Sequence, residues 1–386
     1  MVVTGVTGFV ASWVAYTCLK AGFRVRGTVR SLKDQDRFVH LARDFCPKTQ
    51  GAKHTIKLVE ADLLNPDDWD VAMLGATYCI HVASPVPLLE PKDKDEVIRP
   101  AVEGTLNVLG ACARSKTMKR VVMTSSAAAV AYGRGPADGV EFTDESWTVM
   151  DDPNFPLGSY EESKTRAEMA AWDFIKEKLP EGCTMDLCTI MPTFIVGNVF
   201  SKNMSSSANL VLQVLLGKMV FLPDITIDCV SVEDVALAHV LALVTPEAGG
   251  KRILLHGGQL SLQDLGRLFV KEFRSKGYKP TSWIAPTWAV KLAAYFDEGA
   301  KALLSSLGAK KVWKVANCYD VLKMQPLNSD VTQSFLDMVY GLVRVGVVED
   351  KSVHFRSKER RLDHETIDRM PGINLAVNDI TEKLRV

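Results

Sequence analysis

The chain has 386 residues, of which 47% are hydrophobic and 24% are charged, so we expect a globular protein with a large core in two lobes or two domains. Lysine and arginine together number 46, as do aspartate and glutamate, and the net charge is zero. This balance argues against a nucleic acid or an anionic membrane as the main partner.

The eight cysteines show neither a CxxC pair nor the spacing of a metal site. We therefore expect no metal, and free, mostly buried thiols in a reducing compartment. No signal peptide is visible, and no apolar run reaches the roughly 18 residues that a membrane span needs. These features predict a cytoplasmic protein without a membrane partner.

Short β-branched segments alternate with helical patterns in the first half of the chain. The predicted strands are "MVVTG", "RVRGTVR", "TIKLVEADL", "TYCIHVAS", "RVVMTSS" and "DLCTIMPTFIVG". Such alternation predicts an α/β fold, a doubly wound parallel sheet with helices on both faces. The first strand begins at Met1, which is short for a central strand, so either a few native residues are missing or the start is unusual.

After about Val196 the alternation loosens and helical patterns dominate. We expect a nucleotide-binding domain over residues 1–196, to which a segment from about 225 to 260 returns. Residues 197–350 would form a smaller, mainly helical substrate-binding lobe interleaved with it. Residues 351–386 are polar with weak periodicity. This pattern predicts a C-terminal extension that is either poorly ordered or packed as a clasp against another surface.

A glycine turn links the first strand to the first helix. "TGVTGFVA" contains Gly5-x-x-Gly8-x-x-Ala11, and glycines there let the backbone approach a pyrophosphate at the helix N-terminus. Ala11 meets only the need for a small residue where helix and strand touch. A tight turn without a ligand is the alternative, but strand, glycine turn, helix and second strand in this order favour a Rossmann-type dinucleotide site.

The end of the second strand indicates which dinucleotide binds. An acidic residue there would bind the ribose 2′-hydroxyl of NAD and repel a 2′-phosphate, whereas this chain has Arg30, followed by Lys33 and Arg37. Guanidinium groups suit bidentate phosphate contacts, so the predicted cofactor is NADP. Lys33 and Arg37, each taken alone, could equally lie on a solvated helix face.

Two further strand ends should face the cofactor at the same edge of the sheet. Asp62 follows the third strand, where it would accept a hydrogen bond from the adenine amino group or cap the next turn. Val82 to Ser84 end the fourth strand. His81, just before them, is expected to be a satisfied strand-end histidine rather than a ligand.

The catalytic candidates follow the fifth strand. Ser125 and Ser126 end that strand, and Tyr160-x-x-x-Lys164 opens the helix "GSYEESKTRAEMAAW", where residues four apart share one face. A carbonyl that receives hydride needs a proton donor and a hydrogen-bond partner for its oxygen. Tyr160 would donate the proton, with a pKa lowered by Lys164 and by the positive nicotinamide, and Lys164 would also reach the ribose. The rest of the helix is expected to pack.

Taken together, the segments "VTGVTGFVASW", "HVASP", "RVVMTSSAAAV" and "SYEESKTRAEMAAWDF" resemble the extended short-chain dehydrogenase/reductase family over about residues 2–260. The similar branch holds dihydroflavonol 4-reductases, cinnamoyl-CoA reductases and aldehyde or ketone reductases. The resemblance implies Ser126, Tyr160 and Lys164 as catalytic residues, with Ser125 as the alternative serine. It also implies that residues 192–195 close over the nicotinamide. The predicted cofactor-binding residues are Gly5, Thr7, Gly8, Phe9, Val10, Arg30, Arg37, Asp62, Leu63, Val82, Ala83, Ser84, Tyr160, Lys164, Pro192, Thr193 and Ile195.

The resemblance implies an NADP-dependent oxidoreductase that reduces a small-molecule aldehyde or ketone, as a monomer or homodimer. The stretch before Tyr160 lacks the NWYCYGK signature of cinnamoyl-CoA reductases, which disfavours a CoA thioester. A hydroxysteroid dehydrogenase or a nucleotide-sugar epimerase is an alternative within the family, and Arg30 argues against the epimerase because that class usually prefers NAD. A non-catalytic NADP-sensing scaffold is the alternative outside it, but such proteins typically lose the Tyr or the Lys.

Overall fold

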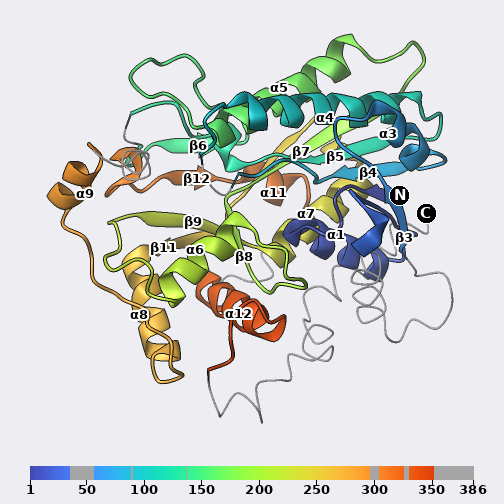
Figure 1. The fold of residues 1–386 in the computed structure, drawn as a ribbon. Coiled ribbons are helices and arrows are strands. Elements are labelled where there is room, and N and C mark those ends of the chain that lie inside the picture. The colour runs from blue at the N-terminus through green and yellow to red at the C-terminus, as the bar shows by residue number, and fades with distance from the viewer. Residues whose placement is uncertain (35–55, 88–89, 136, 296–303, 326–329, 352–386) are drawn as a thin grey trace.

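The computed structural model describes residues 1–34, 56–87, 90–135, 137–295, 304–325 and 330–351 (Figure 1). Arg37, Cys46 and the predicted C-terminal extension beyond Lys351 lie outside the described residues. The seven cysteines in the described ranges are free thiols, and all of these except Cys183 are buried. Among the described helices none is long and apolar enough to cross a membrane.

Seven strands form the main sheet, and every neighbouring pair in it is parallel. Their order is β3-β2-β1-β4-β5-β7-β10. The strands are β1 (Val2–Val3), β2 (Arg26–Val29), β3 (Lys57–Glu60), β4 (Tyr78–His81), β5 (Arg120–Thr124), β7 (Asp186–Pro192) and β10 (Arg252–Leu255). The order reverses between β1 and β4, which is where open α/β sheets bind nucleotides at the carboxyl ends of the strands. The predicted doubly wound parallel sheet is confirmed.

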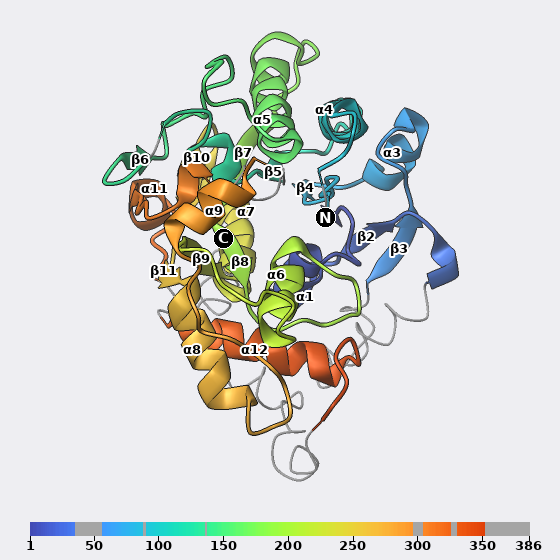
Figure 2. The same cartoon turned by 60° about the vertical axis from the view of Figure 1, so that its left-hand side comes forward.

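Helices cover both faces of this sheet, as Figures 1 and 2 show. One face is covered by α3 (Pro66–Met73), α4 (Asp95–Arg114) and α5 (Ser159–Glu177), and the other by α1 (Phe9–Lys20) and α7 (Val232–Val244). All five residues of β5 are buried; Val121 packs into the core beneath α4 and α5, and Val122 into the core beneath α1 and α7. Burial on both faces explains why the strands read as continuous apolar runs.

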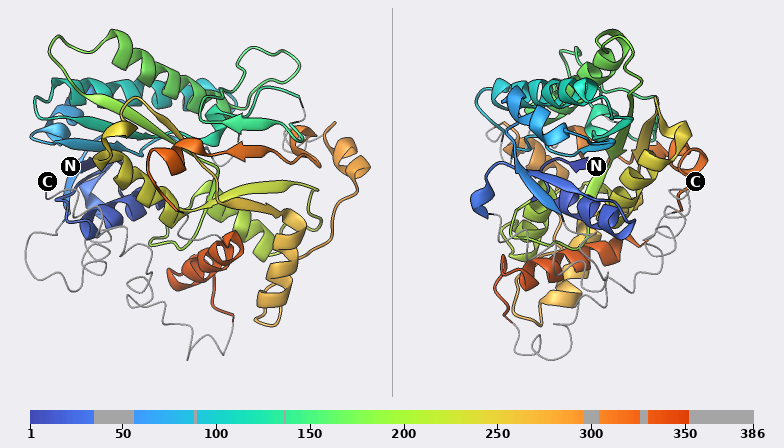
Figure 3. Two further views of the ribbon diagram at one scale, coloured as in Figure 1. Left: turned by 180° about the vertical axis from the view of Figure 1, so that it is seen from behind. Right: turned by 90° about the vertical axis from the view of Figure 1, so that its right-hand side faces the viewer.

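A second lobe lies below the sheet in the orientation of Figure 1 and is seen from behind in Figure 3. Its three-stranded sheet has the order β11-β9-β8, in which β9 pairs antiparallel with β11 and parallel with β8. The elements that build this lobe and its core are β8 (Phe194–Val196), α6 (Ser206–Leu215), β9 (Thr226–Ser231), β11 (Gly258–Ser261), α8 (Leu262–Phe273) and α12 (Val331–Arg344).

Several short elements complete the described fold. Strand β12 (Val312–Lys314) pairs in parallel with β6 (Glu141–Thr143), although the two lie far apart in the chain. The remaining described elements are η1 (Leu32–Asp34), η3 (Ala127–Ala129), η4 (Pro246–Ala248), α9 (Thr287–Ala293), η5 (Leu304–Ser306) and α11 (Ala316–Asp320).

The sequence-based expectation of one continuous strand over "DLCTIMPTFIVG" is wrong. The chain leaves the main sheet after Pro192, where Thr193 N donates to Leu255 O, and the next three residues form β8 in the other sheet. The seventh strand of the main sheet is β10, which lies in the segment of residues 225–260 that was expected to return to the first domain.

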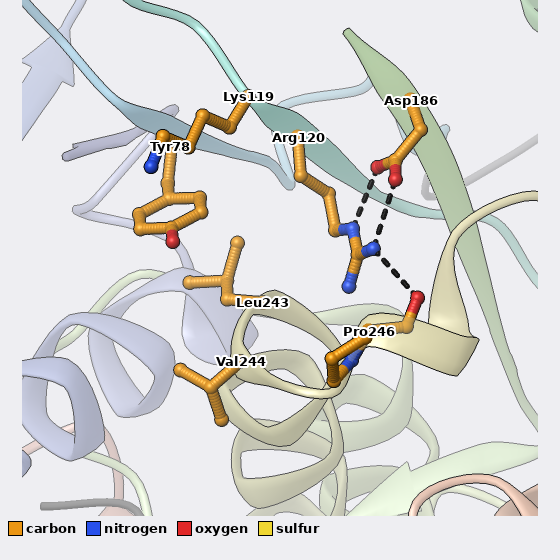
Figure 4. Close-up of a pocket in the computed structure, with 7 residues that line it drawn as sticks. All are labelled: Tyr78, Lys119, Arg120, Asp186, Leu243, Val244 and Pro246. Carbon is orange, nitrogen blue, oxygen red and sulfur yellow. Dashed lines mark hydrogen bonds and ion pairs between the residues drawn. The ribbon is translucent and has the colours of Figure 1, made fainter. Parts of the chain in front are cut away.

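Arg120 joins the sheet to the end of α7 at the amino ends of β4, β5 and β7 (Figure 4). It lies opposite Asp186 in the β5–β7 register and donates two hydrogen bonds to that carboxylate, at 2.6 and 2.8 Å. The same guanidinium donates to the carbonyls of Ala242, Thr245 and Pro246. The last carbonyls of a helix have no partner within the helix, so Arg120 caps α7. Arg120, Asp186 and Pro246 line an open pocket at the edge of the sheet opposite the predicted site, and its polar groups have a structural role.

We expect Arg120→Met to lower the free energy of unfolding by about 2–4 kcal/mol, because it leaves the α7 carbonyls without their donor. Urea denaturation followed by circular dichroism would measure this. Lys119→Met is the matched control, since Lys119 is exposed beside the same pocket. It should change stability by less than about 0.5 kcal/mol, and an equal loss in both variants would contradict the capping role.

Candidate active site

The turn after β1 leaves the N-terminus of α1 open. Gly5 has a φ of +65° and its N–H donates to Thr28 Oγ1 at 3.0 Å, while a Cβ on Gly5 would lie 3.1 Å from the Cβ of Ala83. The turn therefore needs glycine. Gly8 is the N-cap of α1 and has no side chain to cap the helix. The first N–H groups of the helix, including those of Phe9 and Val10, accordingly have no intrahelical acceptor and suit an anion.

Thr4 ties the end of β4 to this turn. Its hydroxyl oxygen accepts hydrogen bonds from the N–H groups of Val82 and Ala83, at 3.0 and 2.9 Å, and its proton therefore goes to His81 Nδ1 at 3.0 Å. His81 Nε2 is then the protonated nitrogen and faces Thr105 at 3.4 Å. Burial lowers the pKa of His81 to about 3, so the ring is neutral. The prediction of a satisfied strand-end histidine is confirmed.

The residues after β2 and β3 are those predicted to bind the adenosine end of the cofactor. Arg30 is exposed directly after β2 and makes no hydrogen bond with another described residue, and Lys33 is exposed in η1. Asp62 Oδ1 accepts from Leu64 N at 2.8 Å, so this side chain caps its turn, and its adenine contact stays a prediction. Leu63 packs against α4 at Gly104, which gives its side chain a packing role.

The catalytic candidates converge at the carboxyl end of β5. Tyr160, in the first turn of α5, lies with its hydroxyl 3.5 Å from Ser126 Oγ, a long hydrogen bond. Ser126 Oγ also accepts from Ala128 N at 3.1 Å as the cap of η3, so its own proton is left to donate elsewhere. Lys164 is one turn further along α5 and only 4% exposed. The structure brings Ser126, Tyr160 and Lys164 to one edge of the sheet.

Ser125 points to a different partner. It is 2% exposed, and its hydroxyl donates to Glu168 Oε2 at 2.6 Å in the buried space between α5 and the sheet. The geometry thus favours Ser126 over Ser125 as the serine beside Tyr160.

In the protein without cofactor, the pKa of Tyr160 lies above its ordinary value. Burial raises the pKa of its phenol above the ordinary value, the hydrogen bond to Ser126 lowers it, and the Glu161 carboxylate raises it. Burial also lowers the pKa of Lys164 to about 8, against an opposing effect of Glu168. Lys164 is not among the groups that shift the pKa of Tyr160 in the protein without cofactor, and the predicted fall of this pKa beside Lys164 and the positive nicotinamide stays a prediction. The phenol stays protonated at neutral pH.

The last predicted cofactor residues follow β7. The Thr193 hydroxyl is buried and has no hydrogen-bond partner among the described residues, at a strand end next to that of β5. Ile195 lies in β8 and packs against the core beneath α1. Thr7, in the glycine turn after β1, is also a predicted cofactor residue, and its carbonyl accepts a hydrogen bond from Asn203 of the second lobe at 2.7 Å.

Two kinds of residue that support the site are not among the predicted site residues. Thr4 and Thr28 hold the glycine turn, and a threonine directly before the first glycine was the available signal for Thr4. Glu168 holds Ser125 and lies four residues after Lys164, so its i, i+4 spacing along the helix could have identified it.

A sequence model of the NAD dependent epimerase/dehydratase family matches residues 1–255. The chain belongs to this family. The match covers β1 to β10 and so includes every predicted site residue, and it confirms the resemblance to extended short-chain dehydrogenases/reductases.

Proteins with similar sequences include reductases. The chain is 38% identical over 256 residues to cinnamoyl-CoA reductase CAD2 of Medicago truncatula, covering 66% of this chain and 74% of that one. It is 35% identical over 264 residues to tetraketide alpha-pyrone reductase 1 of Arabidopsis thaliana, covering 68% and 78%. These relatives support the prediction of an oxidoreductase.

Solved structures share the fold over most of the chain. Gre2 from Candida albicans in complex with NADPH has a TM-score of 0.71 at 27% identity, covering 89% of this chain and 98% of that one. Vestitone reductase from alfalfa has a TM-score of 0.67 at 26% identity, covering 90% and 99%. The coverage extends the likeness beyond residue 255 into the second lobe.

The buried Lys164 should destabilise the fold at neutral pH. Its folded pKa of about 8 lies below the unfolded value of about 10.4, so charging it costs the native state about 3 kcal/mol more than the unfolded state. Lys164→Met should raise the urea midpoint at pH 7. The wild type should gain stability as pH rises from about 8 to about 10.4, because the native ammonium loses its proton first, and the variant should lack this gain.

Lys176→Met, at an exposed position of the same helix, is the control and should leave both the midpoint and its pH dependence unchanged. A Lys164→Met protein less stable than wild type at pH 7 would contradict the cost assigned to the buried charge.

Proposed function

We propose that the protein is an NADP-dependent oxidoreductase that reduces an aldehyde or ketone to an alcohol, with Tyr160 as the proton donor. The carrying observation is the 3.5 Å approach of the Tyr160 hydroxyl to Ser126 Oγ, with Lys164 one helical turn away, at the sheet edge that also holds the open end of α1. The family match and the reductases among the relatives support this proposal.

The residues present fit a dinucleotide. The uncapped start of α1 supplies N–H groups for a pyrophosphate, and Gly5 keeps the turn free of a Cβ that would meet Ala83. Arg30 would hold the 2′-phosphate, and the unpartnered Thr193 hydroxyl would face the nicotinamide end. NADPH, as found bound to Gre2, would supply the hydride for the carbonyl carbon.

The protein's own groups would handle the carbonyl oxygen. The Ser126 proton, which no neighbour requires, would donate to this oxygen as negative charge develops there. Tyr160 would transfer its proton to the same oxygen, and its raised pKa keeps that proton in place until the charge forms. The Lys164 ammonium would stabilise the resulting phenolate and bind the ribose hydroxyls of the cofactor.

The substrate we propose is a small carbonyl compound rather than a CoA thioester, because the chain lacks the signature expected for cinnamoyl-CoA reductases despite its similarity to one. A hydroxysteroid dehydrogenase and a non-catalytic scaffold are the outcomes that the experiment below separates. A nucleotide-sugar epimerase is the remaining alternative; it restores its cofactor in each turnover, and Arg30 argues against it. The monomeric or homodimeric state and the cytoplasmic location stay predictions.

Loss of NADPH absorbance with a panel of methylglyoxal, isovaleraldehyde, dihydroflavonols and steroids would test the activity. Tyr160→Phe should lower kcat by about 100-fold or more because it removes the proton donor. NADPH affinity, measured by fluorescence, should change by less than about threefold, since the ring and the fold are kept. Tight NADPH binding without turnover of any carbonyl would favour the scaffold, and an active Tyr160→Phe variant would refute the assigned acid.

Arg30→Asp should shift the preference from NADPH toward NADH, measured as the ratio of the two kcat/KM values, by on the order of 100-fold. A carboxylate there would repel the 2′-phosphate. Arg24→Asp is the matched control, because Arg24 is exposed just before the amino end of β2 and its substitution changes the charge of the protein by the same amount. An equal shift in both variants would point to overall charge rather than a 2′-phosphate contact.

A further inference from the structure

Glu168 lies at the centre of a buried hydrogen-bond network on α5. Its side chain is fully buried. Oε2 accepts from Ser125 Oγ at 2.6 Å and from Arg252 Nη2 at 3.3 Å, while Oε1 accepts from Thr189 Oγ1 at 2.8 Å and Arg252 Nε at 2.8 Å. Trp172 Nε1 completes the set at 3.3 Å. One carboxylate thus connects α5 to the ends or edges of β5, β7 and β10.

Arg252 makes hydrogen bonds and a ring contact besides its ion pair with Glu168. Nη1 donates to the carbonyls of Asp144 and Ser146, at 3.0 and 2.6 Å. The guanidinium lies 3.6 Å from the centre of the Trp147 ring, within range of a cation–π contact. A buried ion pair of this kind contributes little net stability relative to apolar packing.

The serine pair shows what the network positions. Ser125 contacts α5 at Glu168, and its neighbour Ser126 contacts α5 at Tyr160, eight residues earlier. Two consecutive residues of one strand end therefore hold the helix at two points. A slip of one residue along a helix moves each side chain by about 1.5 Å, which is enough to break a contact that is already 3.5 Å long.

Glu168 also interacts electrostatically with Lys164, which lies one turn before it in α5. His81 of β4 and Glu168 of α5 lie close enough to Lys164 to interact with it electrostatically, and Arg252 of β10 pairs with Glu168. Of these, Glu168 is the negative group that opposes the loss of the Lys164 proton on burial. Removal of its charge would leave Arg252 unpaired and favour the neutral amine.

We propose that Glu168 is a positioning residue of the reductase site, which sets the register of α5 against Ser126 through Ser125 and favours the protonated form of Lys164. This inference rests on the proposed function for its kinetic part only. Glu168 touches neither the carbonyl nor the cofactor; it acts through Ser125 and Lys164.

Two isosteric variants separate positioning from simple packing. Glu168→Gln keeps the shape of the side chain and removes its charge, whereas Thr189→Val removes one hydrogen bond to the same carboxylate and leaves the charge. The first readout is the titration of the Lys164 Cε signal in protein labelled with ¹³C-lysine, assigned by its absence in Lys164→Met. We expect a midpoint near 8 in wild type, a midpoint about one unit lower in Glu168→Gln, and little change in Thr189→Val.

The second readout is the pH profile of kcat with NADPH and a carbonyl that the wild type reduces. The decline of kcat at alkaline pH should begin about one unit lower in Glu168→Gln. Glu168→Asp, which keeps the charge but shortens the side chain, should lower kcat without moving this limb. Ser125→Ala, which leaves the ion pair intact, should lower kcat several-fold with an unchanged Lys164 titration, and it tests the register if Glu168→Gln does not fold.

An identical Lys164 titration in Glu168→Gln and wild type would overturn the electrostatic part of the proposal. Full kcat in Ser125→Ala would overturn the register part. The titration needs neither substrate nor cofactor. A wild type that reduces no carbonyl would therefore refute the proposed function, while the spectra still decide whether Glu168 controls the charge of Lys164.

Discussion

The buried ion pair of Glu168 and Arg252 joins the last strand of the main sheet to the helix that carries Tyr160 and Lys164. In the sheet, β10 is separated from the strands that hold the glycine turn, and α5 packs on the face of the sheet over β5 and β7. Because Ser125 and Thr189 bind the same carboxylate, α5 is held against three strands through one buried group. The catalytic geometry at the first turn of α5 depends on this anchor two turns away.

The two edges of the sheet use their polar groups in opposite ways. At the amino edge, Arg120 donates to Asp186 and to three carbonyls at the end of α7, so its donors are spent on structure. At the carboxyl edge, the start of α1 is uncapped, the Thr193 hydroxyl is unpartnered among described residues and the Ser126 proton is available. The unused groups at the carboxyl edge lie where parallel strands and helix dipoles favour a dinucleotide.

Burial governs the charges at this edge. It makes His81 neutral, keeps Tyr160 protonated and brings the pKa of Lys164 to about 8. A protonated phenol beside an ammonium that is partly desolvated suits the donation of a proton to a developing alkoxide.

Local patterns in the sequence determined the alternation of strands and helices, the glycine turn of Gly5 and Gly8, and the presence of Tyr160 and Lys164 on one helix face, because each depends on residues only a few positions apart. The split between β7 and β8, the different hydrogen-bond partners of Ser125 and Ser126, and the anchor at Glu168 were decided by tertiary structure alone. Arg252 is 84 residues from Glu168 and 108 residues from the Asp144 carbonyl that it also binds, and no local spacing encodes such pairings. The raised pKa of Tyr160 belongs to the same class, since burial, not the neighbouring Lys164, dominates it and burial exists only in the folded chain.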